Sequence, residues 1–255
     1  DKNQNYYKFY KRKNIPIVFI HGVGLDHEMW SPQVKSFKNN SILVYDLLGH
    51  GKTPLIKKNV NFDDFSNQLN KLLNNLNIDK INLVGFSFGS LIAVNFVKRF
   101  QKKVNKLVLI STVYKRNNLE KTNVRDRYKK AKKNIPISNL ALNRWLSSKF
   151  IKLNPKIKKY IQKTLNKNEE DHLNFLKSYK LFSYFKDYTK DIKKIKTPSL
   201  ILTGTKDKGS TVHMSQNLSN ELINSQFFKI KNAKHLCTIE YYSNVNMIIK
   251  KFLRT

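Results

Sequence analysis

The chain alternates short apolar segments rich in Ile, Val and Leu with amphipathic segments, and this alternation restricts its possible folds more than any other feature. The apolar segments read as strands and cover residues 15–20, 41–46, 81–86, 106–111, 197–204 and 225–231. Helical periodicity or capping residues mark the stretches between them, namely 31–38, 61–77, 90–100, 211–222 and 241–253. Strands that are apolar on both faces and alternate with helices predict an α/β fold, with a mostly parallel twisted sheet covered by helices on both faces.

The rhythm of strands and helices breaks once, between residues 112 and 192, where the chain reads as helical with polar interruptions. We therefore expect an α/β core of residues 1–111 and 193–255, interrupted by a helical cap, or lid, of residues 112–192. The end of this cap is rich in large apolar side chains, and some of them should face a cavity beneath it. They are Phe175, Leu176, Tyr179, Phe182, Tyr184, Phe185 and Tyr188.

Composition is compatible with one globular domain that needs no oxidising compartment. The chain has 255 residues, of which 40% are hydrophobic, enough for one sizeable core. Cys237 is its single cysteine, so an internal disulfide is impossible. Apolar stretches are too short for a membrane span, and the N-terminal residues lack the apolar centre of a signal peptide. We expect a cytoplasmic protein, although a first residue other than Met leaves open that N-terminal residues were removed.

The net charge of +32 raises the question of an acidic partner. Of the 49 basic residues only seven are Arg, the side chain best suited to bidentate recognition of phosphates and bases, so we expect no specific nucleic-acid binding. Residues 115–167 carry 17 basic residues against Glu120 and Asp126. Most of this charge is expected to form a solvated face, with the alternative that it steers an acidic substrate or an acidic acyl-carrier protein.

Ser87 stands between two glycines in GFSFG, at the step from a predicted strand to a predicted helix. A G-x-S-x-G pattern in this context is typical of a nucleophile on a sharp turn. Such a turn crowds the backbone, so Gly85 and Gly89 are needed to avoid clashes. It would expose the Ser87 hydroxyl at the carboxyl edge of the sheet and at a helix N-terminus, where negative charge is favoured.

A serine hydroxyl needs a base to accept its proton, and the base needs a partner to orient it. Among six histidines, His235 follows the last predicted strand and would lie at the same sheet edge as Ser87, so it is the predicted base. Asp207 follows the strand before it and is the predicted acid, in the chain order Ser, Asp, His. Asp46 is the rival acid, but it precedes the serine and is expected to hold its own loop.

Acyl transfer also needs hydrogen-bond donors for the oxyanion, commonly backbone N–H groups. The N–H of Phe88, directly after the nucleophile, is one candidate. The loop His21-Gly22-Val23-Gly24 after the first apolar strand offers the second, and we favour Val23 over Gly24.

The segments HGVGLDHEMW, DLLGHGKT, GFSFGS, GTKD and AKH occur in this order along the chain. In them the sequence resembles the α/β-hydrolase superfamily, over essentially its whole length. Within that superfamily it is most similar to small capped carboxylesterases, 3-oxoadipate enol-lactonases and pimeloyl-carrier-protein methyl esterases. The resemblance implies Ser87 as nucleophile, His235 as base, Asp207 as its partner, and the N–H groups of Val23 and Phe88 as oxyanion hole.

Two residues depart from the pattern of the superfamily. Ser90 stands where many members have Gly or Ala, and Lys234 replaces the common Gly before the catalytic histidine. Neither change removes a catalytic group, but both can alter helix packing and loop shape.

Together these features predict a cofactor-free serine hydrolase that cleaves small carboxylic esters or lactones through an acyl-enzyme. A carbon–carbon hydrolase of vinylogous diketones would use the same triad, and a non-catalytic ligand-binding protein on the same fold is the second alternative. No metal site is expected, because His and acidic residues do not cluster at ligand spacing and one Cys excludes a thiolate site.

Overall fold

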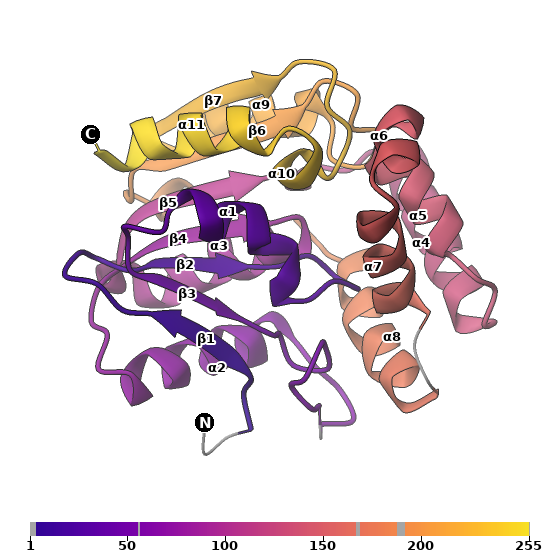
Figure 1. Cartoon of the computed structure of the whole chain (residues 1–255), viewed down its shortest axis with the longest axis horizontal. Coiled ribbons are helices and arrows are strands. Elements are labelled where there is room, and N and C mark those ends of the chain that lie inside the picture. The colour runs from indigo at the N-terminus through magenta and orange to yellow at the C-terminus, as the bar shows by residue number, and fades with distance from the viewer. Residues whose placement is uncertain (1–3, 56, 167–168, 188–191, 255) are drawn as a thin grey trace.

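The computed structural model describes residues 4–55, 57–166, 169–187 and 192–254. Its centre is a seven-stranded sheet, whose arrangement is drawn in Figure 1. The strand order is β1-β3-β2-β4-β5-β6-β7. The strands are β1 (Tyr7–Tyr10), β2 (Ile17–Ile20), β3 (Ile42–Tyr45), β4 (Ile81–Phe86), β5 (Val104–Ile110), β6 (Ser199–Gly204) and β7 (Ser225–Ile230). From β3 to β7 all neighbours pair in parallel, which confirms the predicted mostly parallel sheet.

The edge strand β1 is the one strand that the sequence reasoning did not expect. It pairs antiparallel with β3, from Tyr7 opposite Tyr45 to Tyr10 opposite Ile42. Its side chains alternate between half-buried and exposed, whereas β2 and β3 are buried at every position. A lysine among tyrosines gives a weak apolar signal, so the strand forms because β3 offers it a free edge.

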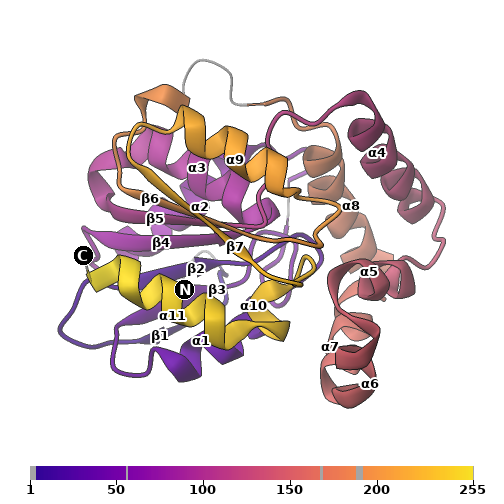
Figure 2. The ribbon, with the colours of Figure 1, turned by 90° about the horizontal axis from the view of Figure 1, so that it is seen from above.

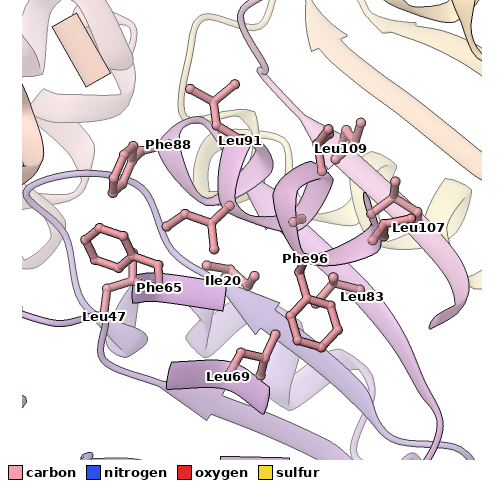
Figure 3. Packing of buried hydrophobic residues seen from close by; sticks show 14 of the residues in the cluster. Ile20, Leu47, Phe65, Leu69, Leu83, Phe88, Leu91, Phe96, Leu107 and Leu109 are labelled. Atoms are coloured by element: carbon pink, nitrogen blue, oxygen red, sulfur yellow. The ribbon is translucent and has the colours of Figure 1, made fainter. Parts of the chain in front are cut away.

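Helices cover both faces of the sheet, as predicted (Figure 2). One face carries α2 (Phe62–Asn75), α3 (Phe88–Phe100) and α9 (Val212–Glu221), and the other carries α1 (Ser31–Ser36) and α11 (Tyr242–Arg254). Because side chains alternate along a strand, Ile20, Leu83 and Leu109 point into the first layer (Figure 3). Their neighbours Phe19, Val84 and Val108 point into the second. The sheet is therefore enclosed by apolar packing on both sides.

A helical segment connects β5 to β6 and stands beyond the carboxyl ends of the parallel strands (Figures 1 and 2). It consists of α4 (Asn118–Lys132), α5 (Ser138–Trp145), α6 (Ser148–Leu153), α7 (Pro155–Leu165) and α8 (Glu169–Ser183), and we call it the α4–α8 segment. The first helix begins at a capping box, in which Asn117 and Glu120 each accept the other's backbone N–H.

Short helical turns complete the described structure: His27–Trp30, Gln101–Lys103, Ile192–Lys194 and α10 (Cys237–Glu240). In the residues that the structure describes, no helix has the length and apolar character to cross a bilayer.

Candidate active site

Ser87 lies at the junction of β4 and α3, at the carboxyl edge of the sheet, where its sequence context predicts it. It has φ 54° and ψ −113°, a backbone state that costs a non-glycine residue about 1–3 kcal/mol. The surrounding structure enforces this state, since the Ser87 N–H donates to the Ile110 carbonyl of β5 at 2.8 Å. The hydroxyl thus stands at the N-terminus of α3, next to backbone N–H groups that have no helical acceptor.

The two glycines of the turn are required by close backbone approaches. A Cβ atom on Gly85 would lie 2.5 Å from the Gly89 carbonyl oxygen, and one on Gly89 would lie 2.3 Å from the Ile20 carbonyl oxygen. Both distances are well inside van der Waals contact, and both neighbours are backbone atoms. The glycines therefore let α3 start directly against β4 and β2, as expected from the pattern.

His235 and Ser87 are in hydrogen-bond contact, with 3.1 Å between Nε2 and Oγ. The imidazole is only 7% exposed and contacts the rings of Phe86 and Trp145, at centroid distances of 5.0 and 6.2 Å. The following residue is tied to the α4–α8 segment, because the Leu236 N–H donates to the Trp145 carbonyl at 2.9 Å. The two ring contacts and the bonded neighbouring residue help to hold the imidazole next to Ser87.

Asp207 completes the line of three side chains from the opposite side of the imidazole. Its Oδ2 lies 2.6 Å from His235 Nδ1, and its Oδ1 accepts the N–H groups of Gly209 and Ser210 at 2.8 and 3.0 Å. Burial by itself raises the pKa of Asp207, but the charge and hydrogen bond of His235 and the two N–H groups lower that pKa below its ordinary value. The carboxylate is therefore ionised at neutral pH and can fix the imidazole tautomer.

The loop after β2 lies beside Ser87 and carries the predicted second oxyanion donor. The Leu25 N–H donates to the Gly22 carbonyl at 3.2 Å, and Gly24 has φ 76°, so the chain turns tightly around Val23. Among the described residues the N–H groups of Val23 and Phe88 have no acceptor. Val23, Ser87 and His235 also line the same cavity.

The rival acid Asp46 lies apart from Ser87 and holds its own loop, as expected. Its Oδ1 is 2.8 Å from both the N–H and the Nδ1 of His27, and its Oδ2 accepts the Lys52 N–H at 2.9 Å. His21 is also structural, since its Nε2 accepts the Leu47 N–H at 3.0 Å.

Both departures from the superfamily pattern are accommodated without disturbing the site. The buried Ser90 hydroxyl donates to the carbonyls of Gly85 and Ile110, at 2.7 and 3.1 Å. The exposed Lys234 ammonium donates to the Asn143 carbonyl at 2.6 Å, which adds another tie between the His235 loop and α5.

A cavity of about 200 Å³ opens over Ser87 and is shared by the sheet edge and the α4–α8 segment. Of the large apolar residues near the end of that segment, Phe175, Tyr179 and Phe182 line the cavity, as predicted for some of them. Tyr188 lies outside the described residues. The sequence reasoning missed Arg116, Arg127 and Arg144 on the cavity wall. Their one available signal was their identity as arginines in a chain that otherwise uses lysine.

The described residues contain no group of three His, Cys, Asp or Glu side chains placed to hold a metal ion. Cys237 is fully buried, and burial raises the pKa of its thiol to about 12, so it has no nucleophilic character at neutral pH.

Comparison with known proteins agrees with this architecture over nearly the whole chain. A (E)-2-((N-methylformamido)methylene)succinate hydrolase from Acinetobacter baylyi is 26% identical over 260 residues, covering 99% of this chain and 95% of the relative. The 3-oxoadipate enol-lactonase 1 of the same organism is 25% identical and covers 95% of this chain and 90% of its own. The crystal structure of the enol-lactonase from Burkholderia xenovorans LB400 superposes with a TM-score of 0.89 at 22% identity, covering 98% of this chain and 96% of that one.

A family profile described as the alpha/beta hydrolase fold matches residues 15–240, which include the turn at Ser87 and the loops that carry Asp207 and His235. That match and the strand order lead to one assignment: this chain is a member of the α/β-hydrolase fold family.

Proposed function

We propose that the protein is a serine hydrolase that cleaves small carboxylic esters or lactones through an acyl-enzyme. The observation that carries the proposal is the continuous contact from Ser87 Oγ through His235 to Asp207, at 3.1 and 2.6 Å, beside a cavity. The names of the two relatives, a succinate-derivative hydrolase and an enol-lactonase, support a small carbonyl substrate.

In the first half of the reaction, His235 Nε2 removes the proton of Ser87 while Oγ attacks the carbonyl carbon. Asp207 holds Nδ1 and stabilises the imidazolium that forms. The carbonyl oxygen becomes an oxyanion, for which the N–H groups of Val23 and Phe88 are the proposed donors. His235 then returns its proton to the leaving alkoxide, and the acyl group stays on Ser87.

In the second half, a water molecule replaces the alcohol and gives its proton to His235. Attack on the acyl-enzyme forms a second oxyanion, whose collapse releases the carboxylic acid and returns the proton to Ser87. The reaction needs no redox partner, because every proton and electron pair is exchanged between the substrate, water and the three side chains.

We further propose that residues 112–192 act as a cap on the core of residues 1–111 and 193–255. The α4–α8 segment supplies most of the cavity wall opposite Ser87. It is fastened near His235 by the Trp145 carbonyl and by Ser147, whose N–H and hydroxyl both donate to the Glu240 carboxylate. Substrate choice would then depend on this segment, while the chemistry depends on the sheet edge.

Labelling with a fluorophosphonate probe tests the nucleophile directly. We expect labelling of the native protein and its loss in Ser87→Ala and His235→Ala. The exposed pair Ser148→Ala and His213→Ala are matched controls that should label normally. Equal labelling of Ser87→Ala and the native protein would refute the proposal.

A substrate panel separates the alternatives that share this triad. Turnover of short nitrophenyl esters supports ester hydrolysis, whereas inertness toward esters with cleavage of a vinylogous diketone identifies a carbon–carbon hydrolase. Absence of turnover and of labelling would favour a ligand-binding protein. An acidic acyl-carrier partner stays a separate hypothesis and gains no support from the named relatives. It would be revealed if the hydrolysis rate fell steeply with salt for carrier-bound esters but not for free esters.

A further inference from the structure

Three of the seven arginines of this chain line the cavity over Ser87. Arg116 precedes α4, Arg127 lies in α4 and Arg144 lies in α5, so this stretch of the chain brings three arginines to the cavity. Lys208 also lines the cavity, and Glu120 is the acidic residue among its lining. The wall around a nucleophile that acts on neutral carbonyl groups is thus strongly positive.

No carboxylate of the described residues forms an ion pair with any of these three arginines. Glu120, the acid in the cavity wall, already accepts the Asn117 N–H at 2.8 Å in the capping box of α4. The Arg127 Nε atom is buried and has no hydrogen-bond partner, as is also true of Arg125 Nε, but of the two residues only Arg127 lines the cavity. Arg116 is buried, and Arg127 and Arg144 are half-buried. Cations in such surroundings are normally paired with an anion, and the described residues supply none here.

The electrostatics of the cluster agree with this reading. Burial and, to a smaller extent, the charge of Arg127 lower the pKa of Arg116 to about 10, while the charges of Asp187 and Glu120 oppose this shift. Burial and the charge of Arg127 also lower the pKa of Arg144. The charge of Arg127 therefore acts unfavourably on both neighbouring guanidinium groups, and a bound anion would offset that repulsion.

Local contacts place the cluster within reach of the reacting groups. The guanidinium of Arg116 stacks over the Phe182 ring at 4.5 Å, and that ring packs edge-on against Phe88, the residue after the nucleophile. Arg144 precedes Trp145, whose ring packs on His235, and its guanidinium approaches Gly209 of the Asp207 loop. A short substrate can therefore contact the cluster and Ser87 at once.

We propose that Arg116, Arg127 and Arg144 form a carboxylate-binding subsite, so that the substrate is an ester or lactone that also carries a free carboxylate. Planar guanidinium groups bind carboxylates through paired hydrogen bonds, and a desolvated wall strengthens them. The chemistry of this inference rests on the proposed hydrolase function, but the anion site can be tested apart from it.

A purely structural role explains some hydrogen bonds of these arginines, but it does not explain why three of them line the cavity. Arg116 donates to the Phe182 carbonyl at 2.9 Å, and a hydrogen bond from Arg127 lowers the pKa of Tyr179 against the larger effect of burial, which raises it. One or two neutral donors would satisfy the same acceptors. Three cations around these acceptors, with Glu120 as the one acid among the residues that line the cavity, are better explained by a bound anion.

Two pairs of matched esters test the subsite and locate its carboxylate. Ethyl hydrogen adipate is compared with ethyl hexanoate for a carboxylate in the acyl part, and 4-acetoxybutanoate with butyl acetate for one in the alcohol part. Hydrolysis is followed by pH-stat titration. We expect kcat/KM to be at least about tenfold higher for the anionic member of one pair.

Arg127→Gln is the decisive variant, because Arg127 is less buried than Arg116. It should raise KM for the preferred anionic ester about tenfold to a hundredfold and leave kcat nearly unchanged, and the kinetic constants for the neutral ester should also stay nearly unchanged. Arg127→Lys should restore part of the lost affinity for the anionic ester. Arg125→Gln is the matched control, since Arg125 lies on the same helix but packs over the Tyr184 ring outside the cavity. Arg125→Gln should leave kcat and KM for all four esters unchanged.

The outcomes distinguish the two proposals. If Ser87 is labelled by the fluorophosphonate but neither anionic ester is preferred, the subsite is refuted and the hydrolase proposal stands. If neither labelling nor hydrolysis occurs, the hydrolase proposal fails, and calorimetric titration of ethyl hydrogen adipate into Ser87→Ala decides the subsite. Binding that Arg127→Gln weakens and Arg125→Gln preserves supports it, whereas no binding, or binding insensitive to Arg127→Gln, overturns it.

Discussion

Replacing Asp207 by Asn changes one atom and should nearly abolish activity, through the tautomer of His235. Two backbone N–H groups, from Gly209 and Ser210, point at Oδ1 at 2.8 and 3.0 Å. They allow only an acceptor there, so the Asn amide must turn its NH₂ group toward His235 Nδ1, which is 2.6 Å from Oδ2 in the native protein. Nδ1 then has to accept, and the proton of the neutral imidazole moves to Nε2.

A protonated Nε2 facing Ser87 Oγ at 3.1 Å cannot remove the serine proton. In serine proteases the corresponding change lowers kcat about ten-thousandfold with the geometry intact. We expect a loss of about a thousandfold to ten-thousandfold here, with KM nearly unchanged because the cavity keeps its shape. Burst and steady-state rates with 4-nitrophenyl acetate at pH 7.5 measure it.

Asp46→Asn is the matched control, because Asp46 is another buried carboxylate that contacts a histidine and two backbone N–H groups. It does not line the cavity. Loss of one charge-assisted hydrogen bond should cost about 1.5–3 kcal/mol of stability. For a chain of this size each kcal/mol lowers Tm by about 2–4 °C, so a clear drop in Tm is expected with kcat within about threefold of native. The reasoning would be refuted if Asp207→Asn kept a tenth of the native kcat, or if kcat fell as far in Asp46→Asn as in Asp207→Asn.

Three further predictions concern stability and reactivity. Burial raises the pKa of Asp46, but the hydrogen bond of His27, the charge of His21 and two N–H groups bring it below its ordinary value. The ionised Asp46 carboxylate therefore stabilises the fold fully above its ordinary pKa of about 4, and this stabilisation is lost as the pH falls through the lower pKa of the folded protein. Urea titrations should show that the free energy of unfolding decreases in acid, and that it decreases less steeply in Asp46→Asn. Gly89→Ala should lower that free energy by more than about 2 kcal/mol, because the new Cβ meets two backbone oxygens at 2.3 and 2.5 Å; an unchanged Tm contradicts it. Cys237 should react with a thiol reagent only after unfolding, and rapid labelling of the native protein would show that its environment is open.

The sheet, and the meeting of Ser87, Asp207 and His235 at one of its edges, could be predicted from the sequence for a physical reason. Parallel strands place their carboxyl ends at one edge, so residues directly after β4, β6 and β7 must lie near one another wherever the helices run. Ser87, Asp207 and His235 all follow such ends. Local glycine requirements at residues 85 and 89 strengthened the prediction, because they depend on the turn itself.

The arginine cluster could not be predicted in the same way. Arg125 and Arg127 lie in one very polar helix and point about 200° apart around its axis, yet the pattern of apolar residues in α4 is too weak to say which faces inward. Tertiary packing of α4 against α8 settles it, and that packing is invisible in the local sequence. The edge strand β1 was missed likewise, because its pairing depends on β3.

The bond between the Trp145 carbonyl and the Leu236 N–H has a kinetic consequence. An outward swing of α5 wide enough to admit a molecule to the cavity would break that bond and withdraw the indole that braces the imidazole. In the proposed reaction, a variant that loosens α5 would therefore be expected to slow acylation as well.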